Sequence, residues 1–94
     1  MEKIKLKFTN ITQYKINIIA SIDKYNNVIV TKSNNNKIYA NDVITHINNI
    51  KINTLQDIRN VINYYDDIVI SINRYIKNNL DSTCLIDENF TFDF

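Results

Sequence analysis

Apolar and charged residues alternate strictly near the start of the chain. Residues 3–8 read Lys-Ile-Lys-Leu-Lys-Phe, so Ile4, Leu6 and Phe8 share one face while the lysines occupy the other. Because side chains in a strand alternate between its two faces, this pattern predicts a strand with one buried face. Lysines on the opposite face are typical of a strand that is protected from pairing with other chains.

Five further segments have the apolar patterns of strands. Residues 14–22 carry apolar side chains at alternate positions and then change register near Ile18 and Ile19, which indicates a bulge. Residues 28–31 are almost wholly apolar, which is typical of a central strand. The remaining predicted strands are 42–47, 50–52 and 68–72, and residues 37–40 are predicted to form one short helical turn.

The clearest local pattern predicts a helix over about residues 54–65. Thr54 is a candidate N-cap, with Asp57 three residues later in the position that a capping box gives to Glu. The stripe expected to face the core consists of Leu55, Ile58, Ile62 and Tyr65. A second stripe on an adjoining face consists of Asp57, Val61 and Tyr64. The helix is therefore expected to border both the core and a second surface.

The composition changes what the turns must be made of. Isoleucine, asparagine and lysine number 19, 17 and 9 of 94 residues, whereas glycine and proline are absent, a bias typical of an AT-rich genome. Without glycine, each backbone position with positive φ is expected to fall to Asn or Asp, which enter the left-handed region most readily. The pairs Asn26-Asn27 and Asn48-Asn49 are the expected tight turns.

Several classes of function are excluded by composition. Phosphate-binding loops and dinucleotide fingerprints need glycine. With 11 basic and 10 acidic residues, a net charge of +1 and interleaved signs, the chain offers no surface for nucleic acid. One histidine, His46, and one cysteine, Cys84, are too few for a zinc site or an internal disulfide. We expect no catalytic residues, no metal and no cofactor, with His46 on a strand surface and Cys84 buried.

The length favours a single domain covering residues 1–94, in which about residues 75–94 supply a final strand or a tail. The N-terminus lacks the continuous apolar run of a signal peptide, and no segment approaches the ~18 apolar residues of a membrane-spanning helix. A cytoplasmic protein without membrane insertion is therefore expected.

The order of elements in the middle of the chain is informative. Asn41-Asp42 opens a predicted strand that ends at Asn48-Asn49, a short strand and the capped helix follow, and the next strand leads to Arg74. This order resembles the PDZ domain, especially the variants of HtrA-type proteases and related bacterial-style modules. In that family Gly-Asp and Asn-Gly stand where this chain has Asn41-Asp42 and Asn48-Asn49. The resemblance covers about residues 14–74.

The resemblance implies an α+β, mostly β fold: a partly open barrel of six strands with one main helix and one short helical turn. It also implies a non-enzymatic interaction module. Such a module binds the hydrophobic C-terminus of a protein, or an extended peptide, by adding it as a strand between the second strand and the main helix.

The resemblance further implies which residues would bind the peptide. They are Gln13, Tyr14, Lys15, Ile16, Asn17, Ile18, Asp57, Val61 and Tyr64. The first four match the family's carboxylate-binding loop, in which Lys15 replaces a glycine and would either block the loop conformation or add a cation. Ile16, Ile18 and Val61 are expected to hold the terminal apolar side chain. Asp57 is expected to disfavour an acidic residue at the third position from the peptide end.

The end of the chain itself, Phe92-Asp93-Phe94, is an apolar-x-apolar sequence of the kind such a site accepts. One interpretation is that Phe90, Phe92 and Phe94 form the inner face of a strand that covers the barrel. The alternative is that the tail docks into its own peptide site, that of a second copy, or that of another protein. Self-association through Phe92-Asp93-Phe94 is thus a candidate interaction.

Three alternatives to a peptide-binding PDZ-like module remain at this point. The first is a degenerate PDZ-like domain, structural or dimerising, whose site is filled by its own tail. The second is a regulatory domain of a larger protease or proteasome-assembly factor. The third concerns the fold alone: the opening hairpin resembles a β-grasp, although no long helix is predicted after the second strand.

Overall fold

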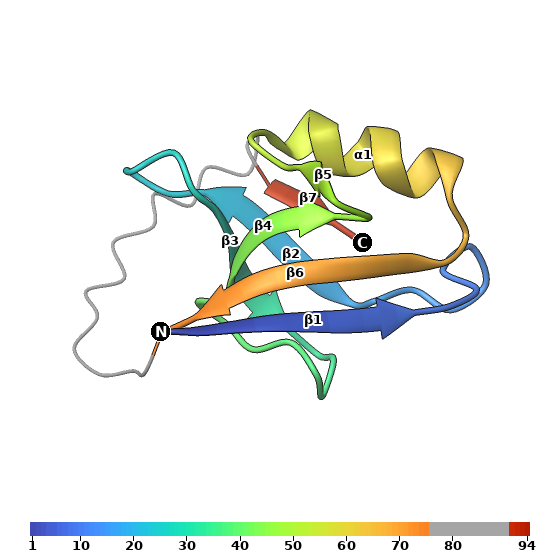
Figure 1. Cartoon of the computed structure of the whole chain (residues 1–94), viewed down its shortest axis with the longest axis horizontal. Coiled ribbons are helices and arrows are strands. Elements are labelled where there is room, and N and C mark those ends of the chain that lie inside the picture. The colour runs from blue at the N-terminus through green and yellow to red at the C-terminus, as the bar shows by residue number, and fades with distance from the viewer. Residues whose placement is uncertain (76–90) are drawn as a thin grey trace.

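A computed structural model describes residues 1–75 and 91–94 of the chain (Figure 1). Within them it contains seven strands and one helix. The elements are β1 (Glu2–Phe8), β2 (Ile18–Ile22), β3 (Val28–Ser33), β4 (Val43–Ile47), β5 (Ile50–Lys51), α1 (Leu55–Tyr64), β6 (Ile68–Arg74) and β7 (Thr91–Asp93). The prediction of a mostly β, α+β chain with one main helix is confirmed.

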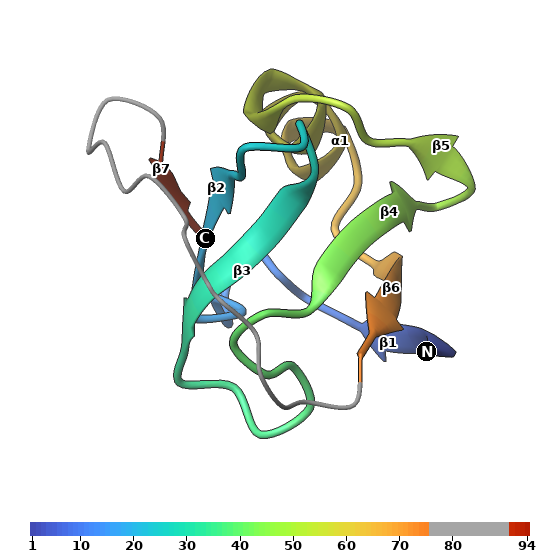
Figure 2. The same ribbon diagram turned by 90° about the vertical axis from the view of Figure 1, so that its left-hand side faces the viewer.

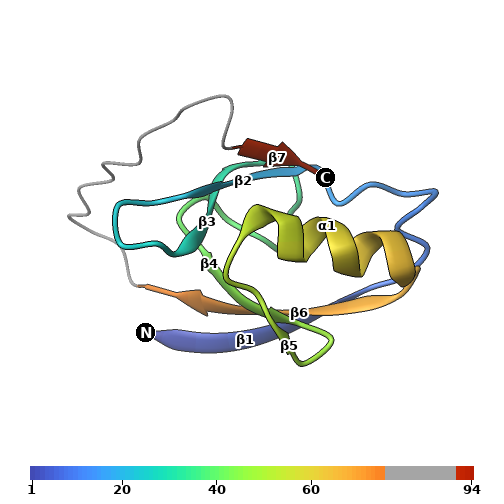
Figure 3. The same cartoon turned by 90° about the horizontal axis from the view of Figure 1, so that it is seen from above.

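The strands form a single open antiparallel sheet. Its order is β1-β6-β4-β3-β2-β7, and β5 pairs with β4 beside this path. The sheet curls, and α1 lies across the space between the β2–β7 side and the β1–β6 side (Figures 2 and 3). Strand β2 is followed directly by β3, so the helix has a different place in the chain order from the helix of a β-grasp. Within the described residues, no helix has the length and apolar character needed to cross a membrane.

Strand β1 has the predicted two-faced pattern. Ile4, Leu6 and Phe8 pack against the core, whereas the intervening lysines are exposed. The strand pairs along its whole length with β6, from Glu2 opposite Arg74 to Phe8 opposite Ile68. The alternation of residues 3–8 was thus sufficient to identify both the strand and its buried face.

Strand β2 begins later than predicted, at Ile18 instead of Tyr14. The N–H groups of Gln13 and Tyr14 both donate to the carbonyl of Asn10, at 3.0 and 2.8 Å, which closes a turn where a strand was expected. A register shift between Ile19 and Ala20 confirms a bulge close to its predicted place. Apolar alternation could not distinguish residues 14–17 from a strand, because this segment buries Ile16 although it forms no strand.

The predicted helical turn at residues 37–40 is also corrected. Side chains organise this segment as turns and bends: Lys37 N–H donates to the Asn35 Oδ1 atom, and Tyr39 N–H donates to Asp42 Oδ2, both at 2.8 Å. Ile38 is fully buried and the hydroxyl of Ser33 donates to its carbonyl at 2.6 Å. Short polar side chains that bond to nearby backbone compete with helix formation, which explains the difference.

Asparagine takes every backbone position with positive φ in the described part of the chain. These residues are Asn10, Asn17, Asn26, Asn41, Asn48 and Asn49. Asn48 and Asn49, at φ 53° and 65°, join β4 to β5 through a two-residue hairpin with Ile47 opposite Ile50. Left-handed φ at both positions is what such a hairpin requires. The prediction from the absence of glycine is therefore confirmed; at Asn26-Asn27, only Asn26 is left-handed.

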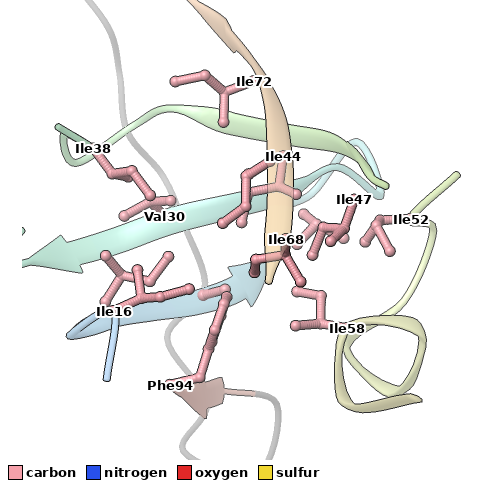
Figure 4. Packing of buried hydrophobic residues seen from close by; sticks show 14 of the residues in the cluster. Ile16, Val30, Ile38, Ile44, Ile47, Ile52, Ile58, Ile68, Ile72 and Phe94 are labelled. Atoms are coloured by element: carbon pink, nitrogen blue, oxygen red, sulfur yellow. The ribbon is translucent and has the colours of Figure 1, made fainter. Parts of the chain in front are cut away.

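Isoleucine dominates the core, which lies between the curled sheet and α1 (Figure 4). The buried cluster contains Ile16, Ile18, Ala20, Val28, Val30, Ile38, Ile44, Ile47, Ile52, Ile58, Val61, Ile68, Ile70, Ile72 and Phe94. Ile44 and Ile47 are both buried although three residues apart, because the β4–β6 register shifts between Ile44 and His46. A bulge of this kind re-aims the side chains that follow it.

One buried ion pair ties the start of β4 to the end of β6. Asp42 is 2% exposed, and Arg74 donates to both its carboxylate oxygens, Nε to Oδ1 at 3.0 Å and Nη2 to Oδ2 at 2.8 Å. The guanidinium also lies 4.0 Å from the centre of the Tyr39 ring and donates to the Lys37 carbonyl. The hydrogen bonds to Asp42 raise the pKa of Arg74 above its ordinary value.

Candidate functional site

The outer edge of β2 carries the end of the chain as an added strand. Strand β7 pairs antiparallel with it, with Asp93 opposite Ile19 and Phe92 opposite Ala20. Beyond these pairs, Ile18 N–H donates to the Phe94 oxygen at 2.9 Å, and Phe94 N–H donates to the Ile18 carbonyl at 3.0 Å. Figures 1 and 3 show β7 alongside β2. The backbone groups that an edge strand leaves open are thus satisfied by residues 91–94.

The last side chain of the chain is buried. Phe94 is 7% exposed and points from the β7 ribbon into the apolar cluster (Figure 4). The same cluster contains Ile16 and Ile18 from the segment leading into β2, and Ile58 and Val61 from α1. Complete burial of a phenylalanine side chain stabilises a fold by about 1.5–3 kcal/mol. The anchor of the docked tail is therefore its terminal residue.

Phe92 lies on the same face of the added strand as Phe94, two residues away. The two rings stack with centroids 5.0 Å apart and an interplanar angle of 18°. The guanidinium carbon of Arg59, on α1, is 4.8 Å from the centre of the Phe92 ring. Asp93, between them, is exposed. Phe90, the third aromatic residue of the predicted inner face, lies outside the described residues.

The predicted capping box is present at the start of helix α1. Asp57 Oδ2 accepts the N–H groups of Asn53 and Thr54 at 2.8 and 3.0 Å, while Asp57 N–H donates to Thr54 Oγ1 at 3.1 Å. The bond from Asn53, followed by those from Thr54, lowers the pKa of the Asp57 carboxyl. This box fixes the start of the helix that carries Arg59 and Val61.

The residues of the second stripe of the helix differ in burial. Val61 is 5% exposed and belongs to the cluster around Phe94, whereas Tyr64 is 80% exposed and packs edge-on against Tyr65. The Asp57 carboxylate serves the helix cap, as described above. Of the first stripe, Ile58 is fully buried, and Tyr65 is 39% exposed because the helix ends at Tyr64.

The turn before β2 is fastened to the segment after the helix. Thr12 donates to Asp66 Oδ1 through both its hydroxyl, at 2.7 Å, and its N–H, at 3.1 Å. The N–H of Asn10 donates to Asp67 Oδ1 at 3.1 Å, and Ile11 N–H donates to the Asp66 carbonyl. The bond from the Thr12 hydroxyl lowers the pKa of Asp66. The local sequence pattern gives no sign of these contacts, because they join residues more than fifty positions apart.

The backbone that enters β2 is fixed from its other side. The carbonyl of Ile16 accepts a bond from Asn35 Nδ2 at 2.9 Å, and the carbonyl of Asn17 accepts one from Asn34 N–H at 2.9 Å. Asn17 itself has a φ of 66°. This left-handed residue turns the chain immediately before Ile18, which makes the reciprocal bonds to Phe94.

The candidate peptide-binding residues therefore differ in their surroundings. Ile16, Ile18 and Val61 lie in one apolar cluster with Phe94. Gln13, Tyr14 and Lys15 are exposed, and the N–H groups of the first two are occupied within their own turn. Arg59, which contacts Phe92, was not among the expected residues. Its helical position lies outside both apolar stripes, so periodicity gave no signal for it.

Other chemistry in the described part of the chain is sparse. His46 is half-buried on β4, with its Nδ1 atom 3.0 Å from Thr45 Oγ1. Residues 1–75 and 91–94 contain no group of three or more His, Cys, Asp or Glu residues arranged to hold a metal ion. Cys84 lies outside the described residues. The sequence matches no protein-family model and no curated protein.

Proposed function

We propose that this chain is a non-enzymatic, PDZ-like interaction module that binds an apolar peptide C-terminus by strand addition to β2. The tail site is defined as the β2 backbone from Ile18 to Ser21 together with Ile16, Arg59 and Val61. In the structure its occupant is the chain's own C-terminus. The observation that carries the proposal is the reciprocal pair of hydrogen bonds between Ile18 and Phe94.

The wider architecture supports the PDZ-like part of the proposal. Asn41, with a φ of 77°, precedes the buried Asp42 at the position where the family has glycine before Asp. Asn48-Asn49 forms the hairpin where the family has Asn-Gly, and Arg74 ends β6. The Asp42–Arg74 ion pair then joins two of the residues on which the resemblance rests. Asparagine in the left-handed region thus takes the place of the missing glycines.

Strand addition has a plain physical basis here. An extended peptide satisfies the open N–H and C=O groups of β2 without requiring particular side chains, which gives affinity. The apolar cluster around Ile16, Ile18 and Val61 then favours a large apolar last residue, as Phe94 illustrates. A docked tail must leave before another peptide can bind, so the tail acts as an intramolecular competitor.

The test uses NMR titration of a chain with a weakened tail, Phe92→Ala/Phe94→Ala. A peptide of residues 89–94 should shift the amides of Ile18, Ala20 and Val61. The same peptide with its last Phe changed to Asp is the control and should produce no shift. If neither peptide nor a panel of apolar C-terminal peptides moves these amides in a folded variant, the proposal is wrong.

A second candidate is a structural role in which the tail only closes the sheet. The burial of Phe94 favours it, because the tail contributes to the core irrespective of any partner. It predicts that loss of the tail lowers stability while no added peptide restores it. Restoration of the melting temperature by the free 89–94 peptide would instead favour the binding module.

A further inference from the structure

Arg59 has one contact that bears on what the tail site selects. Its guanidinium carbon lies 4.8 Å from the centre of the Phe92 ring. In the described part of the chain it makes no ion pair and no hydrogen bond through its side chain. The nearest acid along the helix, Asp57, is engaged by the N–H groups of Asn53 and Thr54. Within the described residues, the Phe92 ring is therefore the group that the Arg59 guanidinium contacts in place of an acid.

The added strand places the third residue from its end there. Side chains of a strand alternate, so Phe92 and Phe94 share a face while Asp93 points away and is exposed. The Phe92 ring contacts the Arg59 guanidinium, and its centroid is 5.0 Å from the centroid of the Phe94 ring. A cation near an aromatic ring is attracted by the ring's quadrupole, and stacked aromatic pairs add to this.

We propose that the tail site selects peptides that end in aromatic-x-aromatic, and that Arg59 is the specificity-determining residue for the aromatic side chain at the third position from the end. This inference rests on the proposed function and names its ligand class. Two contacts define that class. The last ring is buried in the core cluster, and the ring at the third position from the end packs between the Arg59 guanidinium and the last ring.

The proposal replaces Asp57 with Arg59 as the residue that reads this position, and it reverses the expected charge preference. Because the contacting group is a cation, lysine at the third position from the end is repelled. An aliphatic residue keeps the apolar contact and loses the attraction to the guanidinium. The expected order of affinity is therefore Phe above Leu above Lys.

The interaction is first tested within the intact chain. Hydrogen exchange of the Phe94 amide, which donates to Ile18, reports how often the tail opens. We expect Phe92→Leu and Arg59→Gln each to reduce its protection about two- to fivefold. The double variant should be little worse than Phe92→Leu alone, because that change has already removed the contact with Arg59. Asn63→Gln, an exposed substitution on the same helix, is the matched control and should leave protection unchanged.

Peptide binding provides the second arm. Peptides of residues 89–94 carrying Phe, Leu or Lys at position 92 are titrated into Phe92→Ala/Phe94→Ala chains with Arg59 or with Arg59→Gln. Preference for Phe over Leu should fall about two- to fivefold when Arg59 is changed to Gln, and the part that the stack with Phe94 supplies should remain. The assignment of Arg59 is overturned if the two single effects multiply in the exchange experiment, or if the preference for Phe over Leu is unchanged by Arg59→Gln. If Arg59 and Phe92 are coupled in the exchange experiment but no added peptide binds, only the proposed function is overturned.

Discussion

Ile18 and Phe94 exchange two backbone hydrogen bonds, at 2.9 and 3.0 Å, although 76 positions separate them in the sequence (94 minus 18). They are also both almost fully buried, at 1% and 7% exposure. The C-terminus is thus joined to β2 by backbone pairing and by side-chain burial at the same residue. Contacts this far apart in sequence connect the last residue to the core rather than to its neighbours.

Truncation after Asn89, or Phe94→Ala, is therefore expected to lower the free energy of unfolding. Phe→Ala in a core costs about 3–5 kcal/mol, and a terminal edge position should lie near or below the lower value. Urea unfolding, followed by circular dichroism, measures the change. Asp93→Ala, on the exposed face of the same strand, is the control and should change stability little. An unchanged unfolding curve for Phe94→Ala would show that the docked tail contributes nothing.

The Asp42–Arg74 pair should be sensitive to removal of either partner alone. Asp42→Asn leaves the guanidinium of Arg74 without its carboxylate and weakens the bonds around a residue only 2% exposed. Breaking a buried pair typically costs about 3–5 kcal/mol. Since Arg74 retains 21% exposure and can be partly solvated, the lower part of that range is expected.

A double-mutant cycle distinguishes the pair from simple packing. Asp42→Asn combined with Arg74→Met should destabilise by clearly less than the sum of the two single changes, because the second change removes the unpaired charge. Thermal unfolding at neutral pH is sufficient to measure it. Strictly additive losses would mean that Asp42 and Arg74 contribute separately, through Tyr39 N–H and the Lys37 carbonyl.

The features that sequence predicted well depend on local rules. The capping box at Thr54 and Asp57, the hairpin at Asn48-Asn49 and the face of β1 each follow from a few neighbouring residues. The features it missed depend on distant partners. The turn that delays β2 is fastened by Asp66, and Arg59 acquires a role only once Phe92 lies beside it. No periodicity within either segment records such a contact.

The same argument explains which of the candidate peptide-binding residues are buried. The burial of Ile16, Ile18 and Val61 could be predicted, because burial is what an apolar pattern indicates. Tyr64 is equally apolar in pattern but lies at the last turn of the helix, beyond the covered surface. Polar residues gave no such guide, since Asp57 had a local partner in the cap that satisfied it.

Asn41 offers a test of asparagine as a substitute for glycine. Its φ of 77° lies in the left-handed region, where a side chain with a Cβ atom is strained and Asn less so than most. Asn41→Gly should raise the free energy of unfolding by about 0.5 kcal/mol, and Asn41→Ala should lower it by about 1 kcal/mol. Asn53→Gly, at a position without positive φ, is the control and should destabilise. Chemical denaturation decides; a loss of stability on Asn41→Gly would contradict the strain argument.

Acid should destabilise the fold through Asp57 and Asp66. Both carboxyls have a pKa lowered from the ordinary value of 3.8, by the Asn53 N–H and the Thr12 hydroxyl respectively. A group whose pKa is lowered by folding stabilises the protein fully above its unfolded pKa, and that stability is lost as the pH falls through the folded pKa. The melting temperature should therefore fall from about pH 5 downward.

Thr12→Val removes the hydroxyl that is the main cause of the lowered pKa of Asp66, and it should flatten this decline. Thr9→Val, at an exposed position in the same segment between β1 and β2, is the control and should not flatten it. Parallel acid curves for the Thr12→Val variant and the unaltered chain would show that the Thr12–Asp66 bond does not stabilise the charged carboxylate.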